Sequence, residues 1–371
     1  MIYQHAFIKM KVALVHDWLT NLGGAEKVLL ALSEVYPEAP IYTSVYNPAK
    51  TAPFKDKDVR TSFLQKVPLS KNKHQLFPTL RPLAFENFDF SKYDLVISSS
   101  SAEAKGIITK PQTTHICYCH TPTRYYWSDY HAYLNRLQFG ILNPLVRKMM
   151  PKTIHKMRIW DRLAAERVDC FIANSSYVAQ RIKKYYRKEA TIIHPPCDTD
   201  DLKPGSKQGD YFLAMSRLIP YKKIDLIVEA FNNLKLPLKV IGTGPEEQKL
   251  KKLAKKNVEL LGYVGGKKKL KLLQECQAFI FAAEEDFGIV PVEAMACGKP
   301  VIAYGKGGVL DSVVEDETGI FFQEQTPQSL TDAILKFEPS KFDSTKIRKH
   351  AESFSKEEFK RKIKAFVKEK I

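Results

Sequence analysis

The sequence lacks any long uncharged apolar run and any segment typical of a secretory signal. No run approaches the ~18 to 20 apolar residues that a membrane-spanning helix needs, so we expect no transmembrane segment. The first residues, MIYQHAFIK, are too short and too polar for a signal peptide. Met10 directly precedes a strand-like segment, so translation is expected to begin at either Met1 or Met10.

Paired cysteines are also absent. The six cysteines form no CxxC pair and no zinc-type spacing, and most lie in strand-like apolar segments. We therefore expect reduced thiols in a cytoplasmic protein.

Acidic residues are too few to balance the basic ones. The 58 Lys and Arg against 41 Asp and Glu give a net charge of +17, which favours a nucleic acid, an anionic membrane face or a phosphorylated substrate as partner. Much of the excess lies in the lysine-rich stretches 249–256 and 267–271, which are typical of solvated helix faces. No helix-turn-helix, zinc or aromatic RNA-binding signature is present, so we expect no nucleic-acid partner.

The chain is long enough for two domains, because its 371 residues exceed the roughly 250 to 300 at which single cores stop growing. Short apolar runs alternate with amphipathic stretches, which predicts an α/β protein with parallel sheets. A segment rich in Pro, Asp, Lys and Gly at 195–210 predicts the linker. The predicted strands are 11–15, 94–98, 115–119, 170–173 and 191–194 in the first half and 211–215, 238–241, 258–261, 278–281, 300–303 and 320–322 in the second.

Two acids, Glu285 and Glu293, border a predicted strand-to-helix junction. Unpaired backbone N–H groups at such a helix start attract phosphate, and Gly288 would let a ligand approach the backbone closely. Carboxylates there could accept hydrogen bonds from sugar hydroxyls. The alternative is an acidic pair that only caps or solvates the helix start.

The stretch 281–313 resembles the donor-site signature of the family 4 retaining glycosyltransferases, in which seven residues separate two glutamates. The resemblance implies that Glu285 holds hydroxyls of the transferred sugar and Glu293 the nucleotide ribose. Asp286 departs from the family, which often has a small residue there. The sugar and diphosphate would be bound by backbone amides of Phe287, Gly288, Ile289 and Val290.

Arg217 and Lys222 follow the first predicted strand of the second half and resemble the phosphate-binding element of the same family. Charge-assisted hydrogen bonds of roughly 1.5 to 3 kcal/mol each would stabilise the diphosphate leaving group. The alternative is two solvated basic residues. Because these cations supply the charge, the segment Asp198-Thr-Asp200 is interpreted as a turn and no metal is expected.

Two weaker signals complete the second half. Gly242 and Gly244 follow a strand but lack the third glycine of a dinucleotide fingerprint, so they resemble the family's nucleotide-binding turn or form an ordinary tight turn. Tyr263 and Val264 lie in a loop expected to contact the nucleotide base.

In the first half, Gly23 and Gly24 join a strand to an amphipathic helix and would allow a diphosphate or sugar to approach closely, unless they form only a turn. His120 follows another strand and resembles the family's histidine beside the reacting sugar. A neutral imidazole there could donate to a sugar hydroxyl; the alternative is a packed or solvated histidine.

A third region of the first half suggests a surface for lipid. Lysines recur every four residues at 148, 152 and 156, beside apolar Ile154, Met157, Trp160 and Ala164, with Pro151 expected to interrupt the helix. Such a surface could rest on anionic lipid or guide a lipid-diphosphate acceptor, or be an ordinary basic helix face.

The resemblance implies the GT-B fold, with two Rossmann-like parallel-sheet domains facing across a cleft. We expect an acceptor-side domain at 1–203, a nucleotide-sugar domain at 204–350, and a C-terminal helix at 351–371 packing back on the first domain. The reaction would transfer a sugar to an acceptor hydroxyl with retention, using a nucleoside diphosphate sugar as co-substrate and no cofactor.

The segments 16–19, 23–26 and 118–122 look most like bacterial GDP-mannose-dependent mannosyltransferases of surface polysaccharide synthesis. The acceptor would be a glycan or lipid-linked oligosaccharide, at the inner face of the plasma membrane if the contact with anionic membrane holds. A UDP-sugar donor and a GT-B sugar-nucleotide epimerase remain as alternatives, and a nucleic-acid-binding protein is a more distant one.

Overall fold

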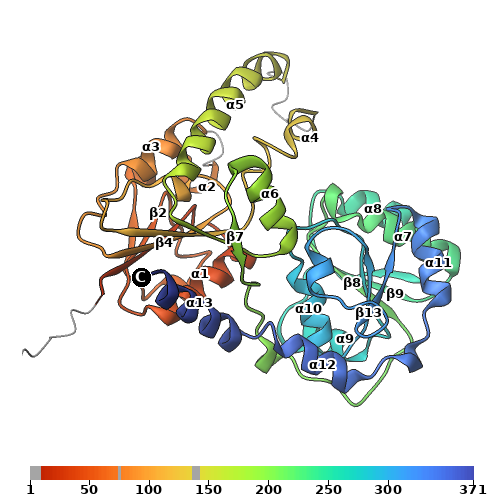
Figure 1. Ribbon diagram of the computed structural model, residues 1–371. Helices are drawn as coiled ribbons and strands as arrows, with labels where there is room; N and C mark the ends of the chain where they lie inside the picture. The colour runs from red at the N-terminus through yellow and green to blue at the C-terminus, as the bar shows by residue number, and fades with distance from the viewer. Residues whose placement is uncertain (1–9, 74–76, 136–142) are drawn as a thin grey trace, which may run out of the picture. The chain divides into compact units, whose positions relative to one another are not determined.

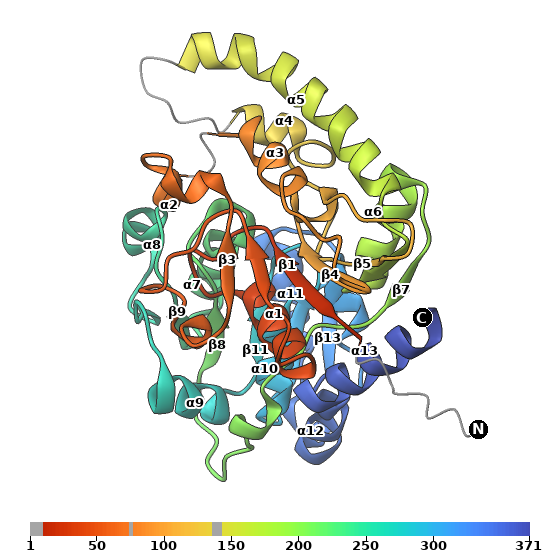
Figure 2. The same cartoon turned by 90° about the vertical axis from the view of Figure 1, so that its left-hand side faces the viewer.

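The computed structural model describes residues 10–73, 77–135 and 143–371. It divides into two compact units, one formed by the chain up to Ile193 together with Lys360–Ile371, the other by His194–Phe359. Each unit is an α/β layer structure built on a parallel sheet (Figures 1 and 2). The predicted α/β class with two parallel-sheet domains is confirmed, and the domain boundaries expected at 203/204 and 350/351 stay predictions.

The first unit contains a seven-stranded sheet in the order β3-β2-β1-β4-β5-β6-β7. All neighbouring strands are parallel, so their carboxyl ends lie along one edge. The strands are β1 (Val12–His16), β2 (Ile41–Thr43), β3 (Val59–Thr61), β4 (Leu95–Ser100), β5 (Thr114–Cys119), β6 (Cys170–Ala173) and β7 (Ala190–Ile192). The helices are α1 (Gly24–Val35), α2 (Ser70–Lys73), α3 (Leu80–Glu86), α4 (Tyr130–Asn135), α5 (Asn143–Glu166), α6 (Ser176–Tyr186) and the greater part of α13 (Lys356–Lys370).

The second unit contains a six-stranded sheet in the order β10-β9-β8-β11-β12-β13, again parallel throughout. The apolar side chains of α7, α8 and α11 pack on one face, and those of α9, α10 and α12 on the other. The strands are β8 (Phe212–Met215), β9 (Leu238–Ile241), β10 (Val258–Leu260), β11 (Phe279–Phe281), β12 (Val301–Tyr304) and β13 (Gly319–Phe322). The helices are α7 (Ile224–Leu234), α8 (Glu247–Leu253), α9 (Gly266–Glu275), α10 (Ile289–Ala296), α11 (Pro327–Lys336) and α12 (Ser344–Glu352).

Both sheets change winding direction beside their first strand. The chain moves outward from β1 through β2 to β3 and then returns to add β4 on the other side of β1; β8, β9, β10 and β11 repeat this path. In parallel α/β sheets of this kind, ligands bind at the carboxyl ends of the two strands that flank the reversal. Candidate ligand sites therefore lie at the carboxyl ends of β1 and β4 and of β8 and β11.

Helix α5 corrects one expectation from the sequence. Pro151 does not interrupt the helix, which runs from Asn143 to Glu166 with the proline inside it (Figure 1). A proline inside a helix costs about 3 kcal/mol. The side chains of Ile154 and Met157, in the turn that follows the proline, are buried and hold the helix against the rest of the unit. Within the described ranges, none of the helices combines the length and the apolar composition that crossing a bilayer requires.

Candidate active site

The candidate donor site of the second unit centres on an ion pair between two predicted residues. The Lys222 Nζ contacts Glu285 Oε1, with both side chains mostly shielded from solvent. Lys222 ends a 3-10 turn (Pro220–Lys222) that follows β8, and Glu285 follows β11. The structure therefore brings together, at the reversal of the sheet, two residues that are 63 positions apart in the sequence.

Arg217, the other predicted cation, lies exposed in the same loop after β8 and donates to the hydroxyl of Tyr221 at 3.3 Å. Its guanidinium is accessible to an anion approaching this edge of the sheet. A planar guanidinium gives paired hydrogen bonds to phosphate oxygens, whereas the Lys222 ammonium acts as a point charge. The two cations at one sheet edge suit a diphosphate.

Gly242 and Gly244 pack closely against the backbone of this loop. A Cβ on Gly242 would lie 1.8 Å from the carbonyl oxygen of Ser216, and one on Gly244 would lie 2.3 Å from that of Leu218. The backbone N–H of Leu218 in turn donates to Thr243 at 2.9 Å. The packing of the two glycines thus positions the Arg217 loop, and their predicted contact with a nucleotide stays a prediction.

Helix α10 begins beside Glu285. Its N-cap, Gly288, has φ +83°, a left-handed conformation that side chains rarely adopt. Because the first N–H groups of a helix have no partner within it, the amides of Ile289 and Val290 are available to an anion. The Phe287 side chain is buried, and its ring stacks on His194 with centroids 5.3 Å apart. Phe287 can therefore offer its backbone to a ligand while its ring anchors the loop.

Glu293 lies within α10, buried, and its Oε2 is 2.6 Å from the Nζ of Lys269 on α9. Lys269 belongs to the lysine-rich stretch 267–271, which the sequence presents as a solvated helix face. One lysine of that run is in fact only 27% exposed and pairs with a predicted site residue. The sequence gives no signal that separates Lys269 from its neighbours.

Gly307 and Gly308 close the other side of the Glu285 loop. A Cβ on Gly307 would lie 2.6 Å from the Glu285 carbonyl oxygen, and one on Gly308 would lie 2.2 Å from that of Asp286. The N–H of Gly308 donates to the same Glu285 oxygen at 2.8 Å. The glycine pair thus fixes the backbone that carries Glu285.

The loop between β10 and α9 places its two predicted residues differently. The Tyr263 side chain is 84% exposed, whereas Val264 is buried in the core of the unit. An exposed ring at a sheet edge can stack on a base, but a buried valine can contribute only its backbone. Contact of either residue with a nucleotide stays a prediction.

In the first unit, Gly23 caps α1 and its N–H donates to the Glu26 carboxylate at 2.8 Å. A Cβ on Gly24 would meet no atom within 4 Å, so the helix start is open on that side. The sheet places this loop at the carboxyl end of β1, beside the reversal. The predicted glycine loop is therefore a capped helix start with free space next to it.

His120 lies at the end of β5 and joins a chain of polar side chains on the same face of the sheet. Its Nε2 is 2.8 Å from the Ser99 Oγ, which is 3.1 Å from the His16 Nδ1. The His16 Nε2 lies 3.7 Å from Glu26 Oε1. Burial, and secondarily the nearby His16, lower the pKa of His120 to about 3, so its imidazole is neutral in ordinary buffers. Ser99, Glu26 and His16 were not predicted as site residues from the sequence.

Asp17 holds the loop that follows β4. Its carboxylate is buried and accepts hydrogen bonds from the backbone N–H groups of Ser101 at 2.6 Å, Ala102 at 3.0 Å and Ala104 at 2.8 Å. A buried carboxylate is stable when several donors surround it. Asp17 thus fixes the backbone beside Ser99 and His120.

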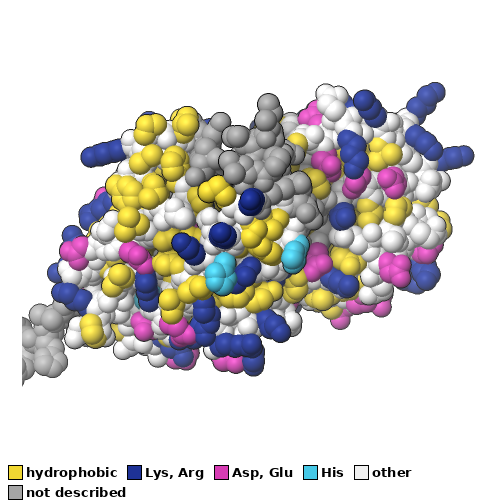
Figure 3. Space-filling view, turned by 90° about the horizontal axis from the view of Figure 1, so that it is seen from above, with side chains coloured by type: hydrophobic (Ala, Val, Ile, Leu, Met, Phe, Trp, Pro, Cys, Tyr) yellow, Lys and Arg dark blue, Asp and Glu magenta, His cyan; other side chains and the backbone are white. Residues whose placement is uncertain are grey.

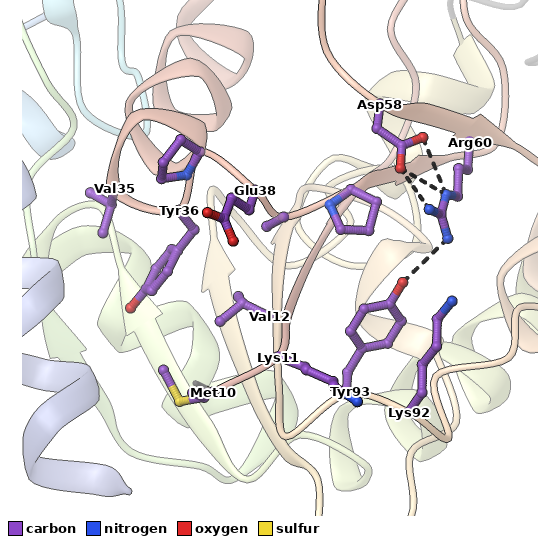
Figure 4. Close-up of a pocket in the computed structure, with 13 residues that line it drawn as sticks. Met10, Lys11, Val12, Val35, Tyr36, Glu38, Asp58, Arg60, Lys92 and Tyr93 are labelled. Atoms are coloured by element: carbon purple, nitrogen blue, oxygen red, sulfur yellow. Dashed lines mark hydrogen bonds and ion pairs between the residues drawn. The ribbon is translucent and has the colours of Figure 1, made fainter. Parts of the chain in front are cut away.

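A cavity of about 650 Å³ lies at the opposite edge of the same sheet. It is lined by residues that precede β1, β3 and β4, including Lys11, Asp58 and Tyr93, and Arg60 is bound to Asp58 at 2.6 Å (Figure 4). This edge carries the amino ends of the strands. The cavity is therefore separate from the candidate site.

Two family models match consecutive parts of the chain. One described as "Glycosyl transferases group 1" matches residues 199–361, and one described as "Glycosyltransferase Family 4" matches residues 22–201. Together they include nearly all the candidate site residues of both units.

Curated relatives and solved structures agree with these matches. An uncharacterized glycosyltransferase of Methanocaldococcus jannaschii is 28% identical over 49% of this chain and 53% of its own length. The human alpha-1,3/1,6-mannosyltransferase ALG2 is 30% identical over 46% of this chain and 51% of its own. The chain thus spans about half the length of these relatives.

A crystal structure of Anabaena HepE in complex with UDP superposes with a TM-score of 0.71 at 18% identity, covering 97% of this chain and 100% of that one. At this identity the likeness shows the fold, which is that of GT-B enzymes. The two family models, which together match residues 22–361, show that the chain belongs to the family 4 glycosyltransferases.

Proposed function

We propose that this protein is a retaining glycosyltransferase that transfers mannose from GDP-mannose to a hydroxyl of a glycan or lipid-linked oligosaccharide in cell-surface polysaccharide synthesis. The observation that carries the proposal is the Lys222–Glu285 pair at the reversal of the second sheet. It sets a carboxylate for sugar hydroxyls beside an ammonium for phosphate, next to exposed Arg217 and the start of α10.

In this proposal the acceptor oxygen forms a bond to the anomeric carbon as the bond from that carbon to the diphosphate breaks. The acceptor proton passes to the departing phosphate oxygen on the same face of the sugar, which keeps the anomeric configuration. Arg217 and Lys222 stabilise the negative charge that develops on the leaving group, and this stabilisation is worth more in the transition state than before it. Because the two cations supply this charge, the proposal requires no metal.

The choice of mannose is supported by the human relative, which is named a mannosyltransferase. The structural neighbour with bound UDP favours a uridine nucleotide instead, and a UDP-sugar is therefore the second candidate donor.

Thermal unfolding in the presence of nucleotide sugars distinguishes the two donors. A donor at 100 times its Kd should stabilise the protein by about 2.7 kcal/mol through mass action. We expect GDP-mannose to raise the Tm clearly and UDP-glucose to leave it nearly unchanged. Arg217→Ala should reduce the shift, because it removes a diphosphate contact. The opposite preference would replace GDP-mannose with a UDP-sugar, and incubation with labelled donor and no acceptor would detect an epimerised product.

We further propose that helix α5 contacts the cytoplasmic face of the plasma membrane, where a lipid-linked acceptor would lie. The three lysines at 148, 152 and 156 are exposed, as are Ile159 and Leu163 at 51% and 58%, while the opposite face of the helix is buried. Figure 3, seen from the side of α5, shows hydrophobic and basic side chains intermixed. A surface of this composition combines apolar contact with attraction to anionic headgroups.

Sedimentation with vesicles tests this contact. Binding should require anionic lipid, weaken as salt rises, and fall roughly 100-fold when the three lysines are changed to glutamine, because each contributes about 1 kcal/mol near such a surface. Changing Lys249, Lys251 and Lys255 of the second unit to glutamine is a control with the same loss of charge. Equal binding to neutral and anionic vesicles would contradict the proposal.

A further inference from the structure

A series of polar contacts links Glu26, His16, Ser99 and His120. The positions of the atoms determine which group donates and which accepts at each contact. Ser99 lies between two imidazoles, with its Oγ 3.1 Å from the His16 Nδ1 and 2.8 Å from the His120 Nε2. A hydroxyl has a single proton, so Ser99 can donate to only one of the two rings and must accept from the other. The contacts with Ser99 alone are compatible with either direction.

Glu26 removes this ambiguity. Its Oε1 lies 3.7 Å from the His16 Nε2, and both side chains are buried. With His16 neutral, a nitrogen lone pair facing a carboxylate would be repelled, whereas an N–H facing it is attracted. The proton of His16 therefore belongs on Nε2, which leaves Nδ1 as an acceptor.

The remaining hydrogen bonds follow in order. Ser99 donates its proton to the His16 Nδ1, and its oxygen then accepts from the N–H at Nε2 of His120. His120 keeps its other nitrogen, Nδ1, without a proton. In the part of the chain that the structure describes, no hydrogen bond to that nitrogen is present.

We propose that Glu26, His16 and Ser99 are positioning residues that fix the tautomer of His120, so that its Nδ1 accepts a hydrogen bond from a sugar hydroxyl. This rests on the proposed function for the identity of the ligand, but the tautomer itself is a property of the free protein. It reverses the sequence-based expectation that His120 donates to the sugar.

Glu26→Gln tests this assignment, because its amide can keep the contact with Gly23 and present a donor instead of an acceptor to His16. Its Oε1 can accept from the Gly23 N–H as the carboxylate does now at 2.8 Å, so the cap of α1 is retained. Its Nε2 then faces His16 with a donor. The His16 proton moves to Nδ1, Ser99 donates to His120, and the His120 proton moves to Nδ1.

Ring-nitrogen NMR of protein labelled with ¹⁵N-histidine, at about pH 8 where imidazoles are neutral, reads each tautomer without any ligand. His120 is assigned from the signals lost in His120→Asn. We expect the Nε2–H form in the wild type, the Nδ1–H form in Glu26→Gln, and a mixture in Ser99→Ala. Ser98→Ala is a matched control: its Oγ is 2.8 Å from the His115 Nε2, on the opposite face of β4. Glu34→Gln controls for a lost charge on α1.

An Nδ1–H His120 in the wild type, or an unchanged His120 tautomer in folded Glu26→Gln, would overturn the proposal. If Glu26→Gln does not fold, Ser99→Ala decides, since an unaltered single tautomer there shows that Ser99 does not set it. With the donor found by thermal shift, we expect kcat/KM to fall about 3- to 10-fold in Glu26→Gln, the size of one hydrogen bond, with both controls unaffected. If the tautomers behave as expected but no sugar is transferred, the proposed function fails and the assignment of the tautomer stands.

Discussion

Replacing Glu285 by glutamine should lower the rate of sugar transfer by about 10²- to 10³-fold while the protein stays folded, as expected for a preorganised charge at the reacting centre. Glutamine has the same size but no charge, so it cannot form an ion pair with the Lys222 ammonium or stabilise by its charge the positive charge that develops at the anomeric carbon. Transfer of labelled sugar under single-turnover conditions measures the effect.

The control for Glu285→Gln is Glu259→Gln on β10. Glu259 is 60% exposed and pairs with Lys239 at 4.0 Å, so its replacement removes a charge from the same unit without touching the candidate site. Because exposed pairs contribute about 0 to 1 kcal/mol, its turnover and Tm should stay near those of the wild type. Equal turnover in the two variants would show that Glu285 takes no part in the reaction.

Asp161→Asn should have the largest effect on stability. The Asp161 carboxylate is fully buried and accepts from Lys105 Nζ at 2.5 Å, Trp127 Nε1 at 2.7 Å and the Tyr186 hydroxyl at 2.8 Å. Asparagine would leave the buried Lys105 ammonium without its counter-charge, which costs about 3 to 5 kcal/mol. For a unit of this size the Tm should fall by roughly 6 to 20 °C, measured by calorimetry.

The pH dependence of the stability of Asp161→Asn tests whether the unpaired charge of Lys105 causes the loss of stability. Burial alone would lower the pKa of Lys105, but the attraction of Asp161 outweighs burial and the pKa is raised. Without that attraction the folded-state pKa should drop below the ordinary value of about 10.4. The unfolded chain then binds more protons between the two values, so the free energy of unfolding of the variant should rise with pH in that window.

Adding Lys105→Met to Asp161→Asn should recover part of the lost stability, because the unpaired charge is removed. A double variant no more stable than the single one would show that lost hydrogen bonds, rather than the charge, cause the effect.

The fold could be predicted from the sequence where each strand is a continuous apolar run. All six strands of the second sheet appear close to their predicted positions, because most of them are largely apolar and buried between two helix layers. Lys239 on β9 and Glu259 on β10 each interrupt the apolar pattern only once. In the first sheet β2 and β3 were missed. Three-residue strands are too short to show a period, and Arg60 interrupts β3.

The site could be predicted only in part. The resemblance supplied Glu285 and Lys222, but no spacing rule foretells that residues 63 positions apart form an ion pair. Lys269 was hidden in a run of lysines, and Ser99 in a run of serines that ends β4. Which serine faces His120 depends on the alternation of side chains along the strand, which the structure fixes by pairing Ser99 with His16 and Tyr118.

The hydrogen bonds between the Asp17 carboxylate and the loop after β4 affect the entropy of ligand binding. Ordering a loop residue costs about 1 to 2 kcal/mol of conformational free energy. The backbone donors of Ser101, Ala102 and Ala104 are already held by the buried carboxylate. This loop is therefore ordered when the chain folds, and a ligand that reaches it gains its contacts without that cost. Asp17→Asn should for this reason weaken ligand binding through a less favourable entropy.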